Sequence, residues 1–308
     1  MNKRVSRKAR KVRKARSKNF ILKFMVLVLL IFIYVGFVFL RPKYLNGQDK
    51  FVMAVNGEDG VYVSVFDPGS LSQTNIFIPK DAQVSVAGEL GSWKIGSVWQ
   101  LGINEKMDGG LLARTVSKNF GFPVVGWAGT WGLGFVNGHF RDLVKSVFSS
   151  YQVNLTMGDR LRLAILVLKI PNEGKDDIDL AKSPLLKKTR FLDGGDGFVI
   201  SGKIPEKIAA IFPNGRISKA NLKAKIVDSS ERSGLAEKVG NIIETMGVKV
   251  AVISKDEKRE NFDCRVSGID KSLVLNLSRI LGCSENLKKE TDNFDLEVVL
   301  GSGFPQKF

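Results

Sequence analysis

Histidine is almost absent from this chain, which has a single one, His139, among 308 residues. That count excludes zinc sites built from several histidines and catalytic machinery that needs more than one imidazole. It leaves His139 as the one histidine that could serve as a general base. Because His139 stands directly before a segment with helical spacing, we interpret it as a helix-entry residue.

Acidic residues are absent from the first 43 positions, which carry thirteen Lys or Arg, ten of them before Phe20. Removing those thirteen from the chain's 47 cations leaves 34 against 31 Asp and Glu, a net charge of +3 compared with +16 for the whole chain. No aromatic residue precedes Phe20, so the basic tail has no platform on which nucleic-acid bases could stack. We expect no nucleic-acid partner, and we expect the tail to contact anionic lipid.

Charge is also lacking between Phe20 and Leu40, where Lys23 is the only charged residue. A helix needs about 20 apolar residues to cross a membrane, and the following FVFLRPK lacks the small residues of a cleavage site. The excess of cations before the segment places the N-terminus in the cytoplasm. We therefore predict a cytoplasmic tail (1–19), a single transmembrane helix (20–41) in the cell membrane, and extracytoplasmic domains after it.

The next part of the chain mixes strand and helix patterns. Phe51–Asn56 and Val61–Phe66 are β-rich and flank a Gly-Glu-Asp-Gly turn, which predicts a hairpin. A third short strand is expected at Asn75–Ile78. Helical spacing predicts helices over residues 109–120, 140–148 and 159–170, whereas the polar residues 175–189 predict a loop or an exposed helix.

From about residue 220 the pattern is β-α-β-β-α-β, typical of a compact α/β unit. The predicted strands are 222–227, 248–253, 262–266 and 296–300, and the predicted helices are 233–246 and 271–281. Gly247 and Gly282 stand where helix C-terminal caps belong.

Cysteine occurs only twice, as Cys264 in a predicted strand and Cys283 just after a predicted helix. The helix is expected to run back along the strand over a similar length, which would bring Cys283 near the start of the strand. Outside the membrane such a pair can form a disulfide, stabilising by about 3 kcal/mol. Two free cysteines buried in the core are the alternative.

All four tryptophans (Trp93, Trp99, Trp127 and Trp131) are interleaved with glycines. Aromatic rings in such a setting can line a groove for a sugar ring or a lipid tail. They also pack a core beside tight turns, and we favour core packing.

Residues 220–304 resemble the LytR C-terminal domain. The strand KAKIVD, the helix opened by Ser233-Gly234-Leu235-Ala236 and the terminal EVVLGSGF carry the resemblance. The family favours an Asn-Gly turn after the first strand, where this chain has Asp228-Ser229-Ser230. The resemblance implies an interaction module.

Residues 51–215 resemble the catalytic domain of LytR-CpsA-Psr proteins through FVMAVNGED, VYVSVFDP and NIFIPKD. That family moves glycopolymers from a polyprenyl-pyrophosphate carrier to peptidoglycan with arginines, aspartates and a divalent metal. The resemblance makes Asp59, Lys80, Asp81 and Arg190 the candidate site residues. Lys80 replaces the family's Arg and lacks its bidentate fork, and an Arg-x-Asp of the family is missing at residues 60–62.

We therefore predict an α/β protein with a diverged, non-catalytic LytR-CpsA-Psr-like domain that binds or scaffolds in cell-wall or surface-glycopolymer assembly. Its partners would be a glycopolymer, a polyprenyl-linked precursor or envelope proteins, and no cofactor is expected. The alternative is an active phosphotransferase that uses the four candidate residues with Mg²⁺. A purely structural scaffold for envelope machinery is a third hypothesis.

Overall fold

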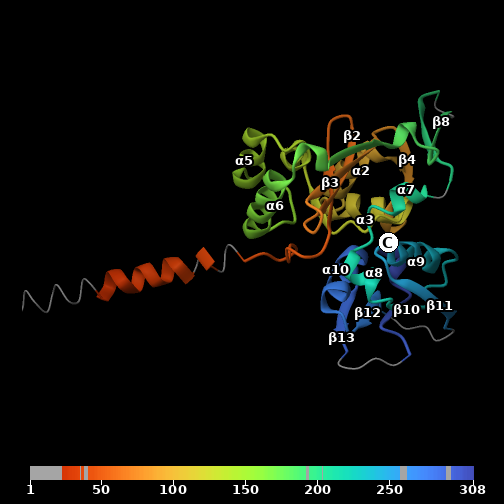
Figure 1. Ribbon diagram of the computed structural model, residues 1–308. Helices are drawn as coiled ribbons and strands as arrows, with labels where there is room; N and C mark the ends of the chain where they lie inside the picture. The colour runs from red at the N-terminus through yellow and green to blue at the C-terminus, as the bar shows by residue number, and fades with distance from the viewer. Residues whose placement is uncertain are drawn as a thin grey trace, which may run out of the picture.

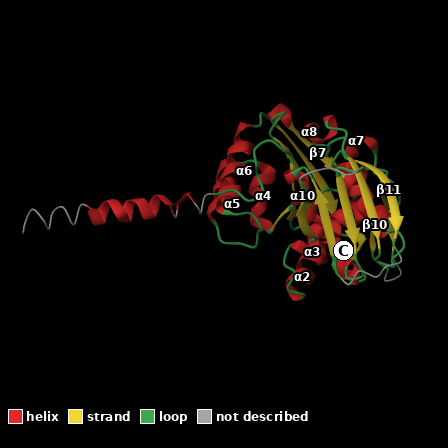
Figure 2. Ribbon diagram, turned by 90° about the horizontal axis from the view of Figure 1, so that it is seen from below, coloured by secondary structure: helices red, strands yellow, loops and turns green. Residues whose placement is uncertain are grey.

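The computed structural model describes residues 23–34, 36–37, 41–191, 194–202, 204–256, 262–288 and 293–308. Residues 23–34 are helical, and this helix extends away from the rest of the molecule (Figures 1 and 2). Among the described residues, no helix combines the length and the apolar character needed to cross a membrane. The predicted tail and part of the predicted span, namely residues 1–22, 35 and 38–40, lie outside the described residues.

The first unit is built on a five-stranded sheet of order β6-β1-β2-β3-β7. Strands β1 to β3 are antiparallel, whereas β6 is parallel to β1 and β7 to β3. The predicted hairpin is confirmed, with Asn56 opposite Val61 across its turn. The strands are β1 (Phe51–Asn56), β2 (Gly60–Asp67), β3 (Ser72–Pro79), β6 (Gly126–Ala128) and β7 (Lys175–Asp179).

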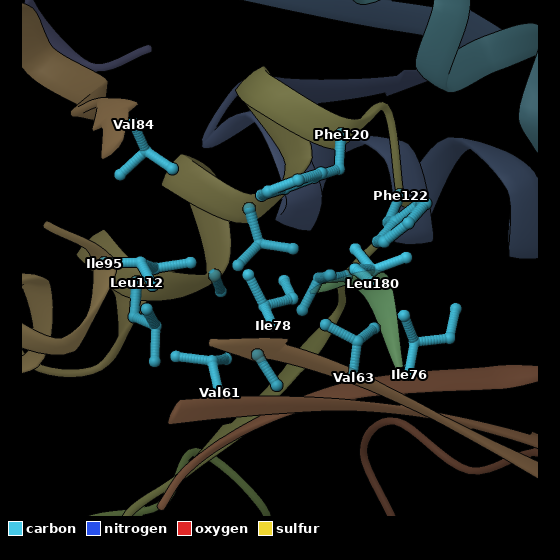
Figure 3. Close-up of a cluster of buried hydrophobic side chains, with 14 of the residues drawn as sticks. Val61, Val63, Ile76, Ile78, Val84, Ile95, Leu112, Phe120, Phe122 and Leu180 are labelled. Atoms are coloured by element: carbon cyan, nitrogen blue, oxygen red, sulfur yellow. The ribbon is translucent and has the colours of Figure 1, made fainter. Parts of the chain in front are cut away.

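Helices cover both faces of this sheet. Alternate residues of β1 point to opposite faces, so Val52 and Ala54 join one core while Met53 and Val55 join the other. Helices α2 (Ile95–Asn104) and α3 (Gly110–Phe120) contribute to the first core, which large side chains fill (Figure 3). Helices α4 (Leu133–Asn137), α5 (Phe140–Phe148) and α6 (Met157–Lys169) contribute to the second.

A small sheet of order β5-β4-β9-β8 lies beside the first. Its strands are β4 (Ala82–Ser85), β5 (Ser92–Lys94), β8 (Leu186–Arg190) and β9 (Asp196–Ile200). The prediction of a loop or exposed helix at 175–189 is wrong, since β7 and most of β8 occupy this range. Both are edge strands, where charged residues are common, so neither shows a hydrophobic pattern.

The second unit is a five-stranded sheet of order β11-β10-β14-β12-β13. Its strands are β10 (Lys223–Asp228), β11 (Lys249–Lys255), β12 (Cys264–Gly268), β13 (Ser284–Leu287) and β14 (Leu296–Leu300), and its helices are α9 (Leu235–Thr245) and α10 (Lys271–Leu281). The predicted order lacked β13. This edge strand, Ser-Glu-Asn-Leu, is exposed throughout, so its sequence carries no apolar alternation.

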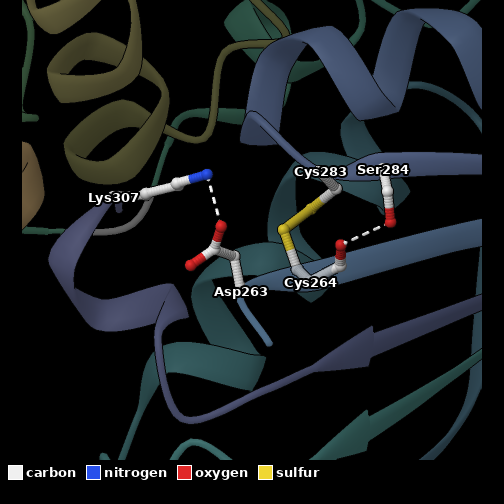
Figure 4. The surroundings of a disulfide bond; sticks show 5 residues. All are labelled: Asp263, Cys264, Cys283, Ser284 and Lys307. Atoms are coloured by element: carbon white, nitrogen blue, oxygen red, sulfur yellow. Dashed lines mark hydrogen bonds and ion pairs between the residues drawn. A yellow bond between two sulfur atoms is a disulfide. The ribbon is translucent and has the colours of Figure 1, made fainter. Parts of the chain in front are cut away.

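A disulfide joins Cys264 and Cys283, so the alternative of two free cysteines does not hold (Figure 4). It links the start of β12 to the chain just after α10, with 4.8 Å between the two Cα atoms. The Ser284 hydroxyl donates to the carbonyl of Cys264 at 3.0 Å. The linker between helix and edge strand is thereby fixed to the sheet.

A buried polar junction ties the start of the first unit to the second. Asp49 accepts hydrogen bonds from Asn214 at 2.6 Å, from Arg216 at 3.2 Å and from the Ser272 hydroxyl. Arg216 also pairs with Asp270, the N-cap of α10. Burial opposes ionisation of Asp49, but its hydrogen bonds outweigh that effect and lower its pKa. The pKa of Asp270 is lowered chiefly by Arg216.

Candidate functional site

Asp59 and Lys80 form one exposed ion pair. Asp59 lies in the turn between β1 and β2, and Lys80 follows the last residue of β3. The Lys80 amide donates to the Asp59 carbonyl at 3.1 Å, and the side chains are 3.9 Å apart from Nζ to Oδ1. The side chain of Lys80 is 54% exposed and that of Asp59 is 85% exposed. Water therefore screens the pair strongly.

Asp81 belongs to a second ion pair rather than to the first. Its carboxylate lies 3.9 Å from Nζ of Lys94, the last residue of β5. The Lys94 ammonium also lies 5.6 Å from the ring centroid of Phe191. The neighbouring residues Lys80 and Asp81 thus have different partners.

Arg190 ends β8, where it is paired in register with Asp196 of β9. Its Nε donates to the Gly194 carbonyl at 3.2 Å, which directs the guanidinium to its own hairpin. Within the described ranges, Arg190 makes no hydrogen bond or ion pair with Asp59, Lys80 or Asp81. The four candidates therefore make three different contacts, and only Asp59 and Lys80 share one.

A divalent metal has little to bind among these residues. Mg²⁺ prefers several oxygen ligands in octahedral geometry, and the candidates offer two carboxylates, each already paired with a lysine. Across the part of the chain that the structure describes, no three His, Cys, Asp or Glu side chains are grouped as a metal site would require. The residues present do not fit the metal of the phosphotransferase alternative.

Asp59 also borders a groove of about 660 Å³ at the edge of the first sheet. His139, Lys175, Asp177 and Lys182 are among the other residues that line it. His139 is the N-cap residue of α5, as expected for a helix-entry residue. The groove is lined by both lysines and aspartates.

A larger cleft of about 740 Å³ separates the two units and was not predicted from the sequence. Lys118 from α3 and Lys238 from α9 both line it. Burial first, and then the charge of Lys238, lower the pKa of Lys118 to about 8, although Glu89 acts in the opposite direction. The Lys118 ammonium donates to the Val86 carbonyl at 3.2 Å. No local pattern could reveal two lysines 120 positions apart in one cleft.

The tryptophans divide between core and surface. Trp99 and Trp127 pack edge to face, 6.0 Å between ring centroids, against the first core. Trp93 and Trp131 are about half exposed. Core packing thus holds for two of the four rings.

Comparison with known proteins gives partial structural similarity. No protein-family model and no curated protein matches the sequence. Among solved structures, TagT of Bacillus subtilis is 14% identical, with a TM-score of 0.37 over 52% of this chain and 87% of that one. A LytR-CPS2A-psr family protein with bound octaprenyl pyrophosphate lipid is 14% identical, with a TM-score of 0.38 over 56% and 91%.

A transcriptional regulator from Enterococcus faecalis is 12% identical, with a TM-score of 0.38 over 66% of this chain and 89% of that one. These TM-scores are below 0.5, so the similarity does not by itself establish membership of a family. This chain is a mixed α/β protein whose structural neighbours include LytR-CpsA-Psr proteins at low identity.

Proposed function

We propose that this chain is a membrane-anchored cell-envelope protein that binds or scaffolds in cell-wall or surface-glycopolymer assembly without catalysing transfer. The observation that carries the proposal is that the candidate residues pair in different contacts and do not all contact one another. Lys80 pairs with Asp59, Asp81 pairs with Lys94, and Arg190 contacts its own hairpin.

Phosphotransfer from a pyrophosphate requires cations that converge on the charge developing in the transition state. The two exposed ion pairs each combine one positive and one negative charge, so they do not provide a cluster of positive charge. Exposed pairs of this kind contribute about 0–1 kcal/mol to stability, so these ion pairs do little to fix the side chains of Lys80 and Asp81.

The topology in this proposal comes from the sequence. A basic cytoplasmic tail at 1–19 and a transmembrane helix at 20–41 would leave the domains at 51–215 and 220–304 on the extracytoplasmic side of the cell membrane. The resemblances supply the ligand class, a glycopolymer or a polyprenyl-linked precursor, and suggest that residues 220–304 act as an interaction module for envelope proteins.

The test reconstitutes the full chain in vesicles with a polyprenyl-pyrophosphate-linked glycan, peptidoglycan and Mg²⁺. We expect no transfer from the wild type or from Lys80→Ala/Asp81→Ala. The matched control, Lys307→Ala/Asp263→Ala, removes an ion pair of the second unit. Transfer by the wild type that the first variant abolishes and the control retains would establish the phosphotransferase alternative.

Crosslinking in cells separates binding from pure scaffolding. Recovery of glycan or lipid-linked precursor supports the binding role. Recovery of proteins alone would favour the structural-scaffold hypothesis.

A further inference from the structure

The segment that follows the apolar N-terminal helix is fixed to helix α6. Oδ1 of Asp159, a fully buried residue, accepts the backbone N–H groups of Lys43, Tyr44 and Leu45 at 2.9, 2.9 and 3.1 Å. The other carboxylate oxygen accepts the amide and the hydroxyl of Thr156, the N-cap of α6. Residues 43–45 are therefore tied to the start of α6.

Helices α5 and α6 lie on the side of the molecule from which the N-terminal helix extends. Both views show this arrangement, and they show β11 on the opposite side (Figures 1 and 2). If the N-terminal helix crosses a bilayer, α5 and α6 are the described elements nearest to its surface.

Helix α5 exposes an apolar stripe that no other described element covers. Phe140, Val144 and Phe148 are exposed, the two phenylalanines by 68% and 66%. Residues four apart differ by only about 40° around a helix, so the three side chains form one strip. The adjacent face, with Leu143 and Val147, is buried against the second core.

Helix α6, which packs against α5, also exposes apolar side chains. Ile165 and Leu168 are both more than half exposed. Ile165 lines a groove of about 290 Å³ together with Leu45 from the entry segment and Leu71. The basic side chains of Arg162 and Lys169 line the same groove. Apolar side chains thus line a groove at the point where the chain enters the unit.

The charges of this surface complement an anionic membrane. Residues 140–169 contain five Lys or Arg and two Asp, a net charge of +3. Asp142 pairs with Lys145 at 3.6 Å, and Asp159 is used by the entry segment. On α5, Arg141 and Lys145 are exposed and stand three positions before Val144 and Phe148, so they lie beside the stripe. An apolar helix face flanked by cations is typical of helices that lie in a membrane interface.

We propose that α5 and α6 form a docking surface for anionic lipid, which holds the first unit against the outer leaflet. The apolar stripe enters the headgroup region while Arg141, Arg162 and Lys169 contact lipid phosphates. This inference rests on the membrane anchor of the proposed function. The docking surface would give the first unit one defined orientation on the membrane, whereas the membrane anchor alone would let the unit rotate.

Trp131 provides an internal reporter of this contact. It is half exposed, its carbonyl accepts the hydroxyl of Ser146 in α5, and its ring centroid lies 5.7 Å from Nζ of Lys145. The full chain is reconstituted in vesicles of phosphatidylcholine and phosphatidylglycerol with brominated acyl chains, which quench tryptophans in contact with lipid. We expect quenching in the wild type that disappears in Trp131→Phe and falls at least twofold in Phe140→Ser/Phe148→Ser.

The matched control, Val252→Ser/Leu287→Ser, removes exposed apolar side chains from β11 and β13. It should be quenched like the wild type. Vesicles without phosphatidylglycerol should give weaker quenching.

Flotation with alkaline extraction reports the anchor separately. A chain that resists extraction but shows no Trp131 quenching would overturn the docking surface and leave the anchor intact. A chain that does not float with vesicles would overturn both. If Trp131 is not quenched and the Val144→Cys variant forms crosslinks between two chains, the surface binds a second copy of the protein. That result would also overturn the proposal.

Discussion

Reduction of the disulfide should destabilise the second unit selectively. Cys264 and Cys283 are 19 positions apart. Opening a loop of that length restores chain entropy to the unfolded state worth about 3 kcal/mol at 25 °C. Because β12 pairs with both β13 and β14, the loss should extend across that half of the sheet.

Hydrogen exchange measured by mass spectrometry is the suitable assay, since all four tryptophans lie in the first unit. A change of 3 kcal/mol corresponds to roughly 150-fold faster exchange in β12 and β14. Strands β1 and β2 should change little, and Cys264→Ala/Cys283→Ala should no longer respond to reductant. Acceleration of less than tenfold in β12, or equal acceleration in β1, would refute the loop-entropy argument.

Three further predictions concern individual carboxylates and cations. Asp159→Asn should lower the unfolding free energy of the first unit by about 2 kcal/mol, because an amide cannot accept all the hydrogen bonds that the carboxylate accepts. Urea unfolding followed by tryptophan fluorescence measures this free energy. An unchanged midpoint of the urea transition would contradict the role given to the entry segment. Asp49 and Asp270 have lowered pKa values, so the stability they contribute is complete above their unfolded pKa and declines as pH falls below about 4. The protection factors of the amides in α8 (Gly215–Lys219) and α10, which compare exchange with the intrinsic rate at the same pH, should fall there. Protection factors that do not change with pH would contradict the role given to Asp49 and Asp270. Lys80→Ala/Asp81→Ala should change the unfolding free energy by less than about 0.5 kcal/mol, and calorimetry showing a larger loss would mean that the pairs are structural.

The first hairpin could be predicted because its signals are local. The turn at Gly57–Gly60 separates two apolar runs, and Gly60 has a further reason to be glycine. A Cβ at that position would lie 2.2 Å from the Ile78 carbonyl oxygen. The helices α5 and α9 were predictable for a similar reason, since each buries a face with helical spacing.

The candidate site could not be predicted from adjacency in the sequence. Lys80 and Asp81 are neighbours in the turn between β3 and β4, yet Lys80 pairs with Asp59 and Asp81 pairs with Lys94. The sequence also gives no sign of the Asp49–Arg216 contact, which joins residues 167 positions apart. Edge strands such as β13 are missed because solvent, rather than a core, determines their side chains.

The most direct test of the non-catalytic role measures the lipid product. Transfer of a glycopolymer from a polyprenyl-pyrophosphate carrier must release polyprenyl phosphate. The full chain in vesicles, in excess over the lipid-linked donor and supplied with Mg²⁺ and peptidoglycan, is therefore assayed by mass spectrometry of extracted lipid. We predict that the donor stays intact at the level of the protein-free control. Release of polyprenyl phosphate that Lys80→Ala/Asp81→Ala abolishes would contradict the account.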